Sequence, residues 1–215
     1  MTAHLPSETP IDPDRVVIRP LTAADSEAYR RLRQSILEIG EGKFFSSSYT
    51  REQQLTTEAQ WREWCTETPV RCTIGSFVDG ELVGSTGIVQ CGDPASRTVE
   101  WNATWMAPKY RRSGIAKRAR EAVRAWSRAH GYRYAITDIR ADNTLFREIR
   151  EREGAMYLCT ERDVTWADGS KADAHYFLLN LSPGAEIERS AGQAVAFVKA
   201  ALAFLTQDAH GDPEP

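Results

Sequence analysis

The chain has 215 residues, a formal net charge of −3, 41% hydrophobic residues and 27% charged residues, which is ordinary for a globular protein with a well-buried core. No apolar run reaches the roughly 20 residues that a membrane-spanning helix needs, and the N-terminal residues lack the basic and apolar regions of a secretory signal. The slight negative charge argues against nucleic acid, because its binding usually needs a basic surface over a whole domain. We therefore expect a cytoplasmic protein that binds neither nucleic acid nor membrane.

The four cysteines, at positions 65, 72, 91 and 159, form no CxxC pair. No histidine stands near them at the spacing typical of a metal site. This pattern favours buried thiols in a reducing compartment over a disulfide framework or a zinc centre. We expect no metal site.

The first predicted elements are a strand and two helices. The residues 15–19, RVVIR, are typical of a short β-strand. The segment LTAADSEAYRRLRQSILEI follows with a helical period, and we expect Ala28, Leu32, Ile36 and Ile39 to share its buried face. A second short helix is expected in TTEAQWREWCTE, with Thr56 or Thr57 as its N-cap.

The central part of the chain predicts a hairpin, a strand and a helix. Two β-rich arms meet at Asp79-Gly80, a pair typical of a tight turn. A strand is expected at 97–106, and a helix with one apolar stripe begins at Gly114 and ends at Gly131. The remaining expected elements are a strand in RYAITDI, a charged helix in NTLFREIRERE, and two strands in AMYLCTERDVTW and AHYFLLNL.

This order predicts an α/β fold with a mixed, mostly antiparallel sheet of six or seven strands and helices on both faces. We expect one domain at 15–182, preceded by a flexible leader at 1–14. A helical extension with a polar tail is expected at 183–215. The apolar stripe of this added C-terminal helix must cover either the chain's own sheet or a second subunit, and a homodimer is our expectation.

A cluster of basic residues surrounds the start of the central helix. Seven basic residues and one acid lie between Lys109 and Arg124. One interpretation is a solvated helix face. The other is an anion site, because a helix N-terminus offers free N–H groups and Gly114 allows a close approach or a positive φ. The strand before the glycine favours the anion site, and a pyrophosphate would suit it.

The motif at this turn, Arg111-Arg112-Ser113-Gly114-Ile115-Ala116, resembles the [Q/R]-x-x-G-x-[G/A] pyrophosphate signature of the GNAT acyl-CoA N-acetyltransferases. GxGxxG and GxxxxGK[ST], the motifs of two other phosphate-binding folds, are absent. VVIRPLTAADSEAY is similar to the opening of GNAT proteins of the ribosomal-protein-acetylating type. ITDIRADNTLFREIREREGA resembles the family's later strand–helix motif. The resemblance covers about residues 15–182 and implies the GNAT fold with acetyl-CoA as cofactor.

The resemblance also implies site residues. The expected cofactor contacts are Met106, Ala107, Arg111, Arg112, Ser113, Gly114, Ile115, Ala116 and Asn143. As catalytic groups we expect the backbone N–H of Met106, facing the thioester carbonyl, and Glu100 as general base. The alternatives are an exposed, inert Glu100 and an Asn143 that caps the following helix, a role compatible with cofactor binding.

Two positions depart from the family pattern. Arg150 stands where many relatives have a tyrosine that serves as general acid, and Phe146 is bulkier than the usual residue. Arginine cannot serve as the acid; Arg150 either stabilises the thiolate or faces solvent. We assign no general acid, since a thiolate with a pKa near ~8.5 can leave without one.

For the acceptor, we expect an aromatic-lined amine pocket that includes Phe45, Trp61 and Trp101, the alternative being that these rings fill the core. The leading hypothesis is an N-acetyltransferase that transfers acetyl from acetyl-CoA to a primary amine of a small molecule or a protein N-terminus. The second hypothesis is a non-catalytic acyl-CoA-binding regulatory module.

Overall fold

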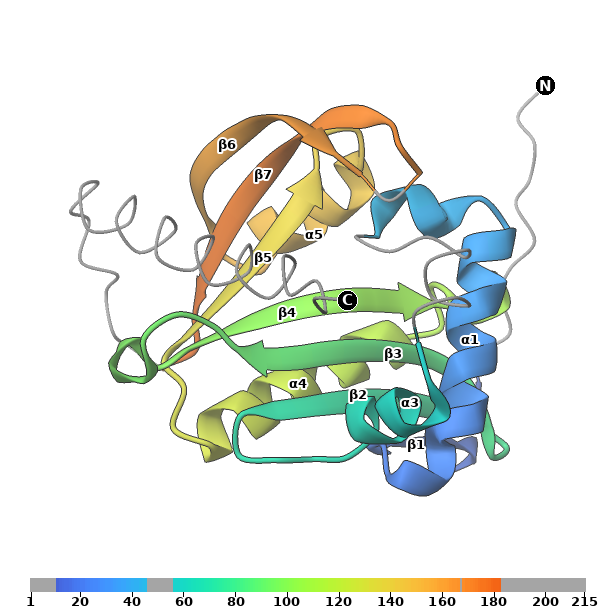
Figure 1. Cartoon of the computed structure of the whole chain (residues 1–215). Coiled ribbons are helices and arrows are strands. Elements are labelled where there is room, and N and C mark those ends of the chain that lie inside the picture. The colour runs from blue at the N-terminus through green and yellow to red at the C-terminus, as the bar shows by residue number, and fades with distance from the viewer. Residues whose placement is uncertain (1–10, 46–55, 167, 183–215) are drawn as a thin grey trace, which may run out of the picture.

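The computed structural model describes residues 11–45, 56–166 and 168–182, which form a seven-stranded sheet with helices on both faces (Figure 1). Its strands are β1 (Val16–Pro20), β2 (Arg71–Val78), β3 (Glu81–Gln90), β4 (Thr98–Met106), β5 (Tyr134–Arg140), β6 (Met156–Thr165) and β7 (Lys171–Asn180). Its α-helices are α1 (Ser26–Glu38), α3 (Glu58–Trp64), α4 (Ile115–Ala129) and α5 (Thr144–Arg152). The strand order is β1-β2-β3-β4-β5-β7-β6. The predicted α/β class and mixed sheet are confirmed.

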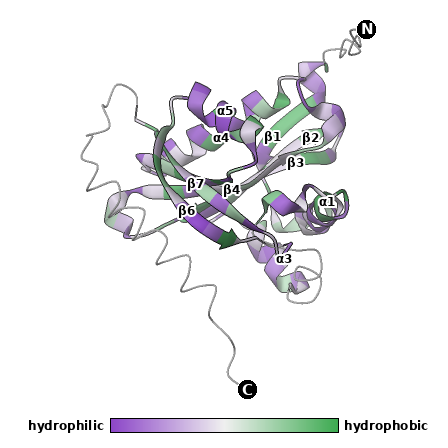
Figure 2. Ribbon diagram, turned by 90° about the horizontal axis from the view of Figure 1, so that it is seen from above, coloured by the Kyte–Doolittle hydropathy of each residue, from purple (hydrophilic) through white to green (hydrophobic). Residues whose placement is uncertain are grey.

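Helices cover the two faces of the sheet differently. On one face, called here the α1 face, Tyr29 of α1 and Trp61 of α3 pack with Phe77 of β2. On the other, the α4 face, Val123 of α4 packs with Trp101 of β4. Figure 2 shows α5 on the same side of the sheet as α4, with α1 and α3 opposite. The sheet is thus the middle of three layers.

Local sequence signals explain the ends of several elements. Asp79 and Gly80 take left-handed φ angles of 51° and 83° in the turn between β2 and β3, as the hairpin prediction requires. Thr57 caps α3 in a capping box with Gln60, which also confirms the prediction. Gly131, with φ of 80°, follows the last turn of α4.

The predicted buried face of α1 is wrong in part. Ala28 is exposed, and Ile39 is 53% exposed and lies beyond the last residue of the helix. The residues of α1 that are buried are Ser26, Tyr29, Leu32, Arg33 and Ile36. The buried stripe is therefore rotated toward Tyr29 and Arg33, whose long side chains place apolar atoms under the helix although both carry polar ends.

Strands β4 and β5 pair over a short distance and then diverge. They run parallel, and their register joins Thr98–Glu100 to Tyr134–Ile136 and goes no further. Beyond this point β4 continues beside β3 as far as Met106, while β5 continues beside β7 as far as Arg140. The sheet is consequently open between the far ends of its two central strands.

Strand β4 contains one extra residue in its diverging half. Ser85 of β3 is opposite Trp105, whereas Gly87 is opposite Asn102, so β4 has a bulge between these pairs. Ala103 in the bulge has a positive φ of 47°. Trp101 and Met106 therefore both pack on the α4 face although five positions separate them.

Several predictions fall outside the described residues. The C-terminal helix lies there, as do most of the leader and positions 46–55 of the loop after Phe45. The domain boundaries and the homodimer stay predictions. In the described segments, no helix has the length and apolar character to span a bilayer.

Candidate functional site

The loop between β4 and α4 presents backbone N–H groups at a helix N-terminus. Arg112 and Gly114 have left-handed φ angles of 63° and 87°, and Gly114 is the N-cap of α4. Within the described part of the chain, the N–H groups of Arg112, Ser113, Gly114 and Ala116 have no backbone acceptor. N–H groups in such turns, aided by the helix dipole, bind anions. The predicted pyrophosphate loop thus has the backbone shape that its role requires.

Two basic side chains beside this loop have no acidic partner in the part of the chain that the structure describes. Arg112 and Lys117 are exposed, and neither forms an ion pair with another described residue. By contrast, Lys109 lies 3.7 Å from Glu81, and Arg118 is directed at the carbonyl of Pro13. Arg112 and Lys117 are therefore the side chains of this cluster that fit a contact with phosphate oxygens.

Arg111 makes protein contacts that differ from the phosphate contact expected of its side chain. Its Nη1 donates to Glu41 Oε1 at 2.9 Å, and its Nη2 donates to Glu41 Oε2. Its Nε donates to the carbonyl oxygen of Met106 at 2.9 Å. All three guanidinium nitrogens donate hydrogen bonds to protein groups. In this structure the side chain of Arg111 therefore stabilises the end of β4 and has no nitrogen left unbonded for a ligand.

The backbone of Met106 faces the opening between β4 and β5. Ala107 N–H donates to the carbonyl of Val83 at 2.8 Å, and alternate residues of an antiparallel strand direct their polar groups to opposite edges. The N–H of Met106 therefore points away from β3, toward the side where β5 has diverged. The direction of this donor is compatible with the contact expected of Met106, which stays a prediction.

Glu100 lies where the two strands separate. It is opposite Ile136 in the last register pair of β4 and β5, and its side chain points to the α1 face because its neighbour Trp101 points to the α4 face. Burial and the nearby Asp138 raise the pKa of Glu100 to about 7, although a hydrogen bond with Asn102 opposes the shift. Glu100 is half-buried, so the alternative of an exposed carboxylate is wrong. Its role as general base stays a prediction, which suits a carboxylate that is half ionised near neutral pH.

Two acids that the sequence analysis did not predict are Asp138, which lies near Glu100, and Glu161, which lies near Asp138. Asp138 of β5 is opposite Tyr176 of β7, and Tyr176 donates its hydroxyl to Glu161 Oε2 at 2.9 Å. Burial raises the pKa of Asp138, and the Glu161 charge adds to the rise. No motif marks these residues, because they come together through pairing of β5, β7 and β6, which the sequence does not reveal.

Asn143 has the capping role that was the alternative to cofactor binding. Its Oδ1 accepts a hydrogen bond from Phe146 N–H at 3.3 Å at the start of α5. The side-chain amide of Asn143 is only half-buried. A cofactor contact through that amide stays a prediction.

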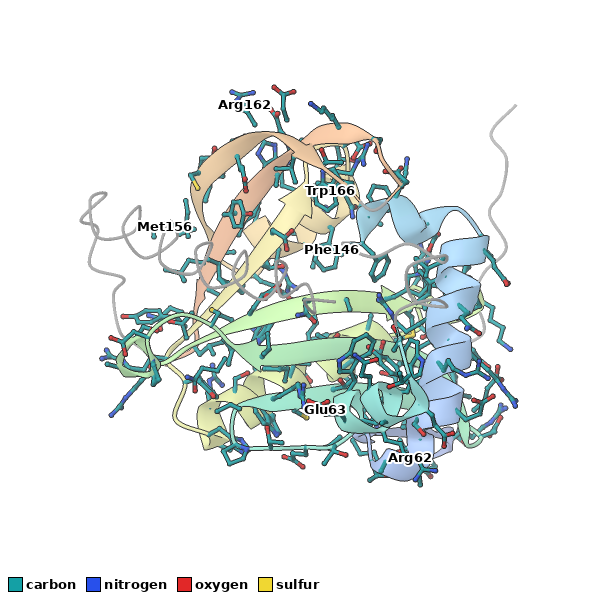
Figure 3. All side chains as sticks on the ribbon, viewed as in Figure 1. Arg62, Glu63, Phe146, Met156, Arg162 and Trp166 are labelled. Carbon is teal, nitrogen blue, oxygen red and sulfur yellow. The ribbon has the colours of Figure 1, made fainter. Side chains whose placement is uncertain are left out.

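Arg150 is buried, which excludes the solvent-facing alternative. Its side chain is 1% exposed and pairs with Glu153 at 2.8 Å. Its guanidinium carbon lies 4.7 Å from the ring centre of Phe146 and 5.5 Å from that of Trp101. Burial lowers the pKa of Arg150. In Figure 3, Phe146 is seen between the ribbons of β4 and β5. Arg150 thus lies between α5 and Trp101 of β4.

The three aromatic residues expected to line an acceptor pocket belong to the core. Phe45 is 8% exposed, Trp61 3% and Trp101 2%. Trp61 packs edge-on against Tyr29 of α1. Trp101 lies on the α4 face, where its Nε1 donates to Ser127 Oγ at 3.2 Å. Burial favours the core alternative for Phe45 and Trp101. Trp61 is also packed in the core, but it borders a pocket between α1 and α3 together with Ser26 and Glu58.

Comparisons with known proteins agree with this geometry. The model of the acetyltransferase (GNAT) family matches residues 34–147, more than half of the chain. No curated protein matches the sequence. Among solved structures, a probable acetyltransferase from Staphylococcus epidermidis is similar with a TM-score of 0.65 and 12% identity, covering 78% of this chain and 99% of that one.

Two other solved structures are similar at comparable levels. A putative acetyltransferase from Salmonella typhimurium, solved with its cofactor acetyl-CoA, has a TM-score of 0.65 and 15% identity, covering 81% of this chain and 98% of that one. The ribosomal-protein-S18-alanine N-acetyltransferase from Escherichia coli has a TM-score of 0.59 and 15% identity, covering 80% and 97%. At these identities the structures show a shared fold, and the family model shows the relationship. The chain belongs to the acetyltransferase (GNAT) family.

Proposed function

We propose that the protein is an acetyl-CoA-dependent N-acetyltransferase that acts on a primary amine. The observation that carries the proposal is the alignment of three features along the opening between β4 and β5. The loop N–H groups that lack a backbone acceptor in the described structure lie at one end, the N–H of Met106 borders the opening, and Glu100 stands where the opening begins. When bound, acetyl-CoA supplies an activated acetyl group as a thioester.

Each of these features has a chemical task in the proposed reaction. The loop amides, with Arg112 and Lys117, hold the pyrophosphate. Glu100 accepts the proton of the incoming ammonium or amine, a task suited to its pKa of about 7. The Met106 N–H donates to the oxygen on which negative charge develops, and such donors typically contribute about 10²–10³ in rate.

The departing thiolate needs no tyrosine in this proposal. A thiol with a pKa near ~8.5 is a good leaving group at neutral pH. Arg150 forms an ion pair with Glu153. The same carboxylate lies 2.5 Å from a guanidinium nitrogen of Arg120 and 3.5 Å from one of Arg124. Three guanidinium groups around one carboxylate leave net positive charge between α4 and α5, which favours a nearby anion.

The acceptor is a primary amine of a small molecule or a protein N-terminus. The similarity of VVIRPLTAADSEAY to the ribosomal-protein-acetylating type supports a protein N-terminus as the acceptor. The E. coli neighbour is named as an enzyme that acetylates an alanine of ribosomal protein S18. The acids Glu100, Asp138 and Glu161 on the α1 face favour a positively charged acceptor over an anionic one. An N-terminal amine and an alkyl amine both satisfy this chemistry.

The test is to incubate the protein with acetyl-CoA and a panel that contains alkyl amines, amino acids and peptides with free N-termini. Free thiol is followed over time, and products are identified by mass. Amine-dependent release of thiol with a product heavier by one acetyl group is expected. Failure to bind coenzyme A at all would refute the proposal.

Replacement of the usual tyrosine by the ion-paired Arg150 favours a second candidate, a non-catalytic acyl-CoA-binding regulatory module. This candidate predicts tight binding of coenzyme A and no thiol release with any amine. The same incubation separates the two functions.

A further inference from the structure

Glu41, in the short 3-10 helix η3 (Glu41–Phe44) after α1, bonds to two residues beside the opening. Its Oε2 accepts from Trp105 Nε1 at 2.6 Å, and its two carboxylate oxygens together receive both Nη groups of Arg111. A bidentate pair of this kind fixes orientation as well as distance. The bond from Arg111 lowers the pKa of Glu41, so its carboxylate is ionised at neutral pH.

These bonds hold the peptide group that carries the N–H of Met106. Trp105 precedes this peptide and is held directly by Glu41. Met106 follows it, and its carbonyl oxygen accepts from Arg111 Nε at 2.9 Å. The peptide N–H that faces the opening is therefore fixed from both sides by groups that converge on one carboxylate.

The end of β4 needs such support because β5 no longer pairs with it beyond Glu100. The support reaches the other strand as well: Arg140, at the end of β5, is directed at the carbonyl oxygen of Lys43 at 3.4 Å. The segment η3 thus contacts the far ends of both diverging strands. In Figure 1 it lies beside the end of α1, close to the ends of β4 and β5.

We propose that Glu41 is a positioning residue, which holds the Met106 N–H and the start of the pyrophosphate loop in one fixed relation through Trp105 and Arg111. The inference rests on the proposed function. Glu41 itself touches neither the acetyl donor nor the amine. Its loss displaces the Met106 N–H, which lowers kcat, and frees Arg111 at the first position of the loop, which weakens the binding of coenzyme A.

The test compares Glu41→Gln with Asp79→Asn. Asp79 is a matched control, because it forms a bidentate pair with Arg15 at the β2–β3 turn and, among the described residues, bonds neither Trp105 nor Arg111. Glu41→Gln is expected to lower kcat/KM for acetyl-CoA by about tenfold or more, since a displacement of about 1 Å can cost about 100-fold. Its affinity for coenzyme A, measured by calorimetry without an acceptor, is expected to fall as well. Asp79→Asn is expected to match the wild type in both measurements.

The outcomes separate the inference from the proposed function. Wild-type rate and affinity in Glu41→Gln, or equal losses in the two variants, would overturn the positioning role while leaving the acetyltransferase intact. A wild-type protein that does not bind coenzyme A would overturn both. If Glu41→Gln does not fold, Trp105→Phe decides, because it removes one bond to the same carboxylate: a lowered kcat supports the role, and an unchanged kcat overturns it.

Discussion

Glu100 and Ile136 form the last pair that joins β4 to β5, and the proposed base therefore sits at the corner of the opening between the strands. On one side of this corner the carboxylate has Asn102 as a partner, and Asp138 of β5 lies close enough to raise its pKa. A carboxylate held this way is close to the ligand space yet poorly hydrated, which is the combination that a general base at neutral pH requires.

Glu100→Gln tests the base. We expect kcat to fall by about 10²–10⁴-fold, the usual contribution of general base catalysis. In the wild type, kcat should rise with pH through about 7 as Glu100 ionises, and this rise should be absent from the variant. Rates are measured across pH at saturating acceptor. Glu63→Gln, at an exposed ion pair with Arg71, is the control and should keep the wild-type profile.

Glu100→Gln, which should lower kcat, should raise the free energy of unfolding at high pH. The folded pKa of Glu100 is about 7 and its ordinary value is 4.5, so the folded state holds the proton more tightly. The free energy of unfolding should therefore decrease as pH rises from about 4.5 to about 7. Glu100→Gln removes this loss. The free energy of unfolding of the variant minus that of the wild type should therefore be larger at pH 8 than at pH 4.5. Denaturant titrations that show a pH-independent difference would contradict the assignment.

Gly114 and Gly131 allow a matched test of the pyrophosphate loop. Both have positive φ angles, 87° and 80°, at opposite ends of α4, and an added Cβ would meet nothing within 4 Å at either position. Alanine should cost about 1–2 kcal/mol of stability at each position, because the left-handed conformation is strained. Only Gly114→Ala should weaken coenzyme A binding, measured by calorimetry. Equal affinities in the two variants would remove the site from this loop.

Trp101→Phe tests whether Trp101 serves the core or the acceptor. The change removes the hydrogen bond to Ser127 and part of a ring that is 2% exposed. The free energy of unfolding should fall by about 1–3 kcal/mol. KM for the acceptor should stay at its wild-type value, and a selective rise in that KM without loss of stability would return Trp101 to the acceptor site.

Predictions that depend on local signals are the ones that the structure confirms. The Asp79-Gly80 turn, the Thr57 cap of α3 and the glycines that bound α4 each depend on residues within a few positions of one another. Their conformations follow from short-range sterics and hydrogen bonds, so the sequence displays them directly. The backbone of the loop before α4 has the predicted shape for the same reason, because it follows from one strand, one glycine and one helix start; its binding of pyrophosphate stays a prediction.

Predictions that depend on contacts between distant segments are less successful. Arg111 looked like a phosphate ligand because nothing in its neighbourhood shows that Glu41, 70 residues earlier, takes its guanidinium group. An aromatic side chain suits a core and a ligand pocket equally well. Which of the two holds Phe45, Trp61 or Trp101 depends on the elements that pack against each ring. The buried state of Arg150 has the same origin, since it depends on how α5 packs against Trp101.

The extra residue at Ala103 makes the two halves of β4 interdependent. Trp101 and Met106 share the α4 face, while Trp105 packs on the α1 face. If β4 kept all its residues but ran as a regular strand without the bulge, its downstream half would turn over, since a shift of one position reverses a strand. The indole of Trp105 would then lie under α4, out of reach of Glu41, and the thioether of Met106 would point toward the acceptor side. The left-handed backbone at Ala103 thus decides which side chains of this strand face Glu41.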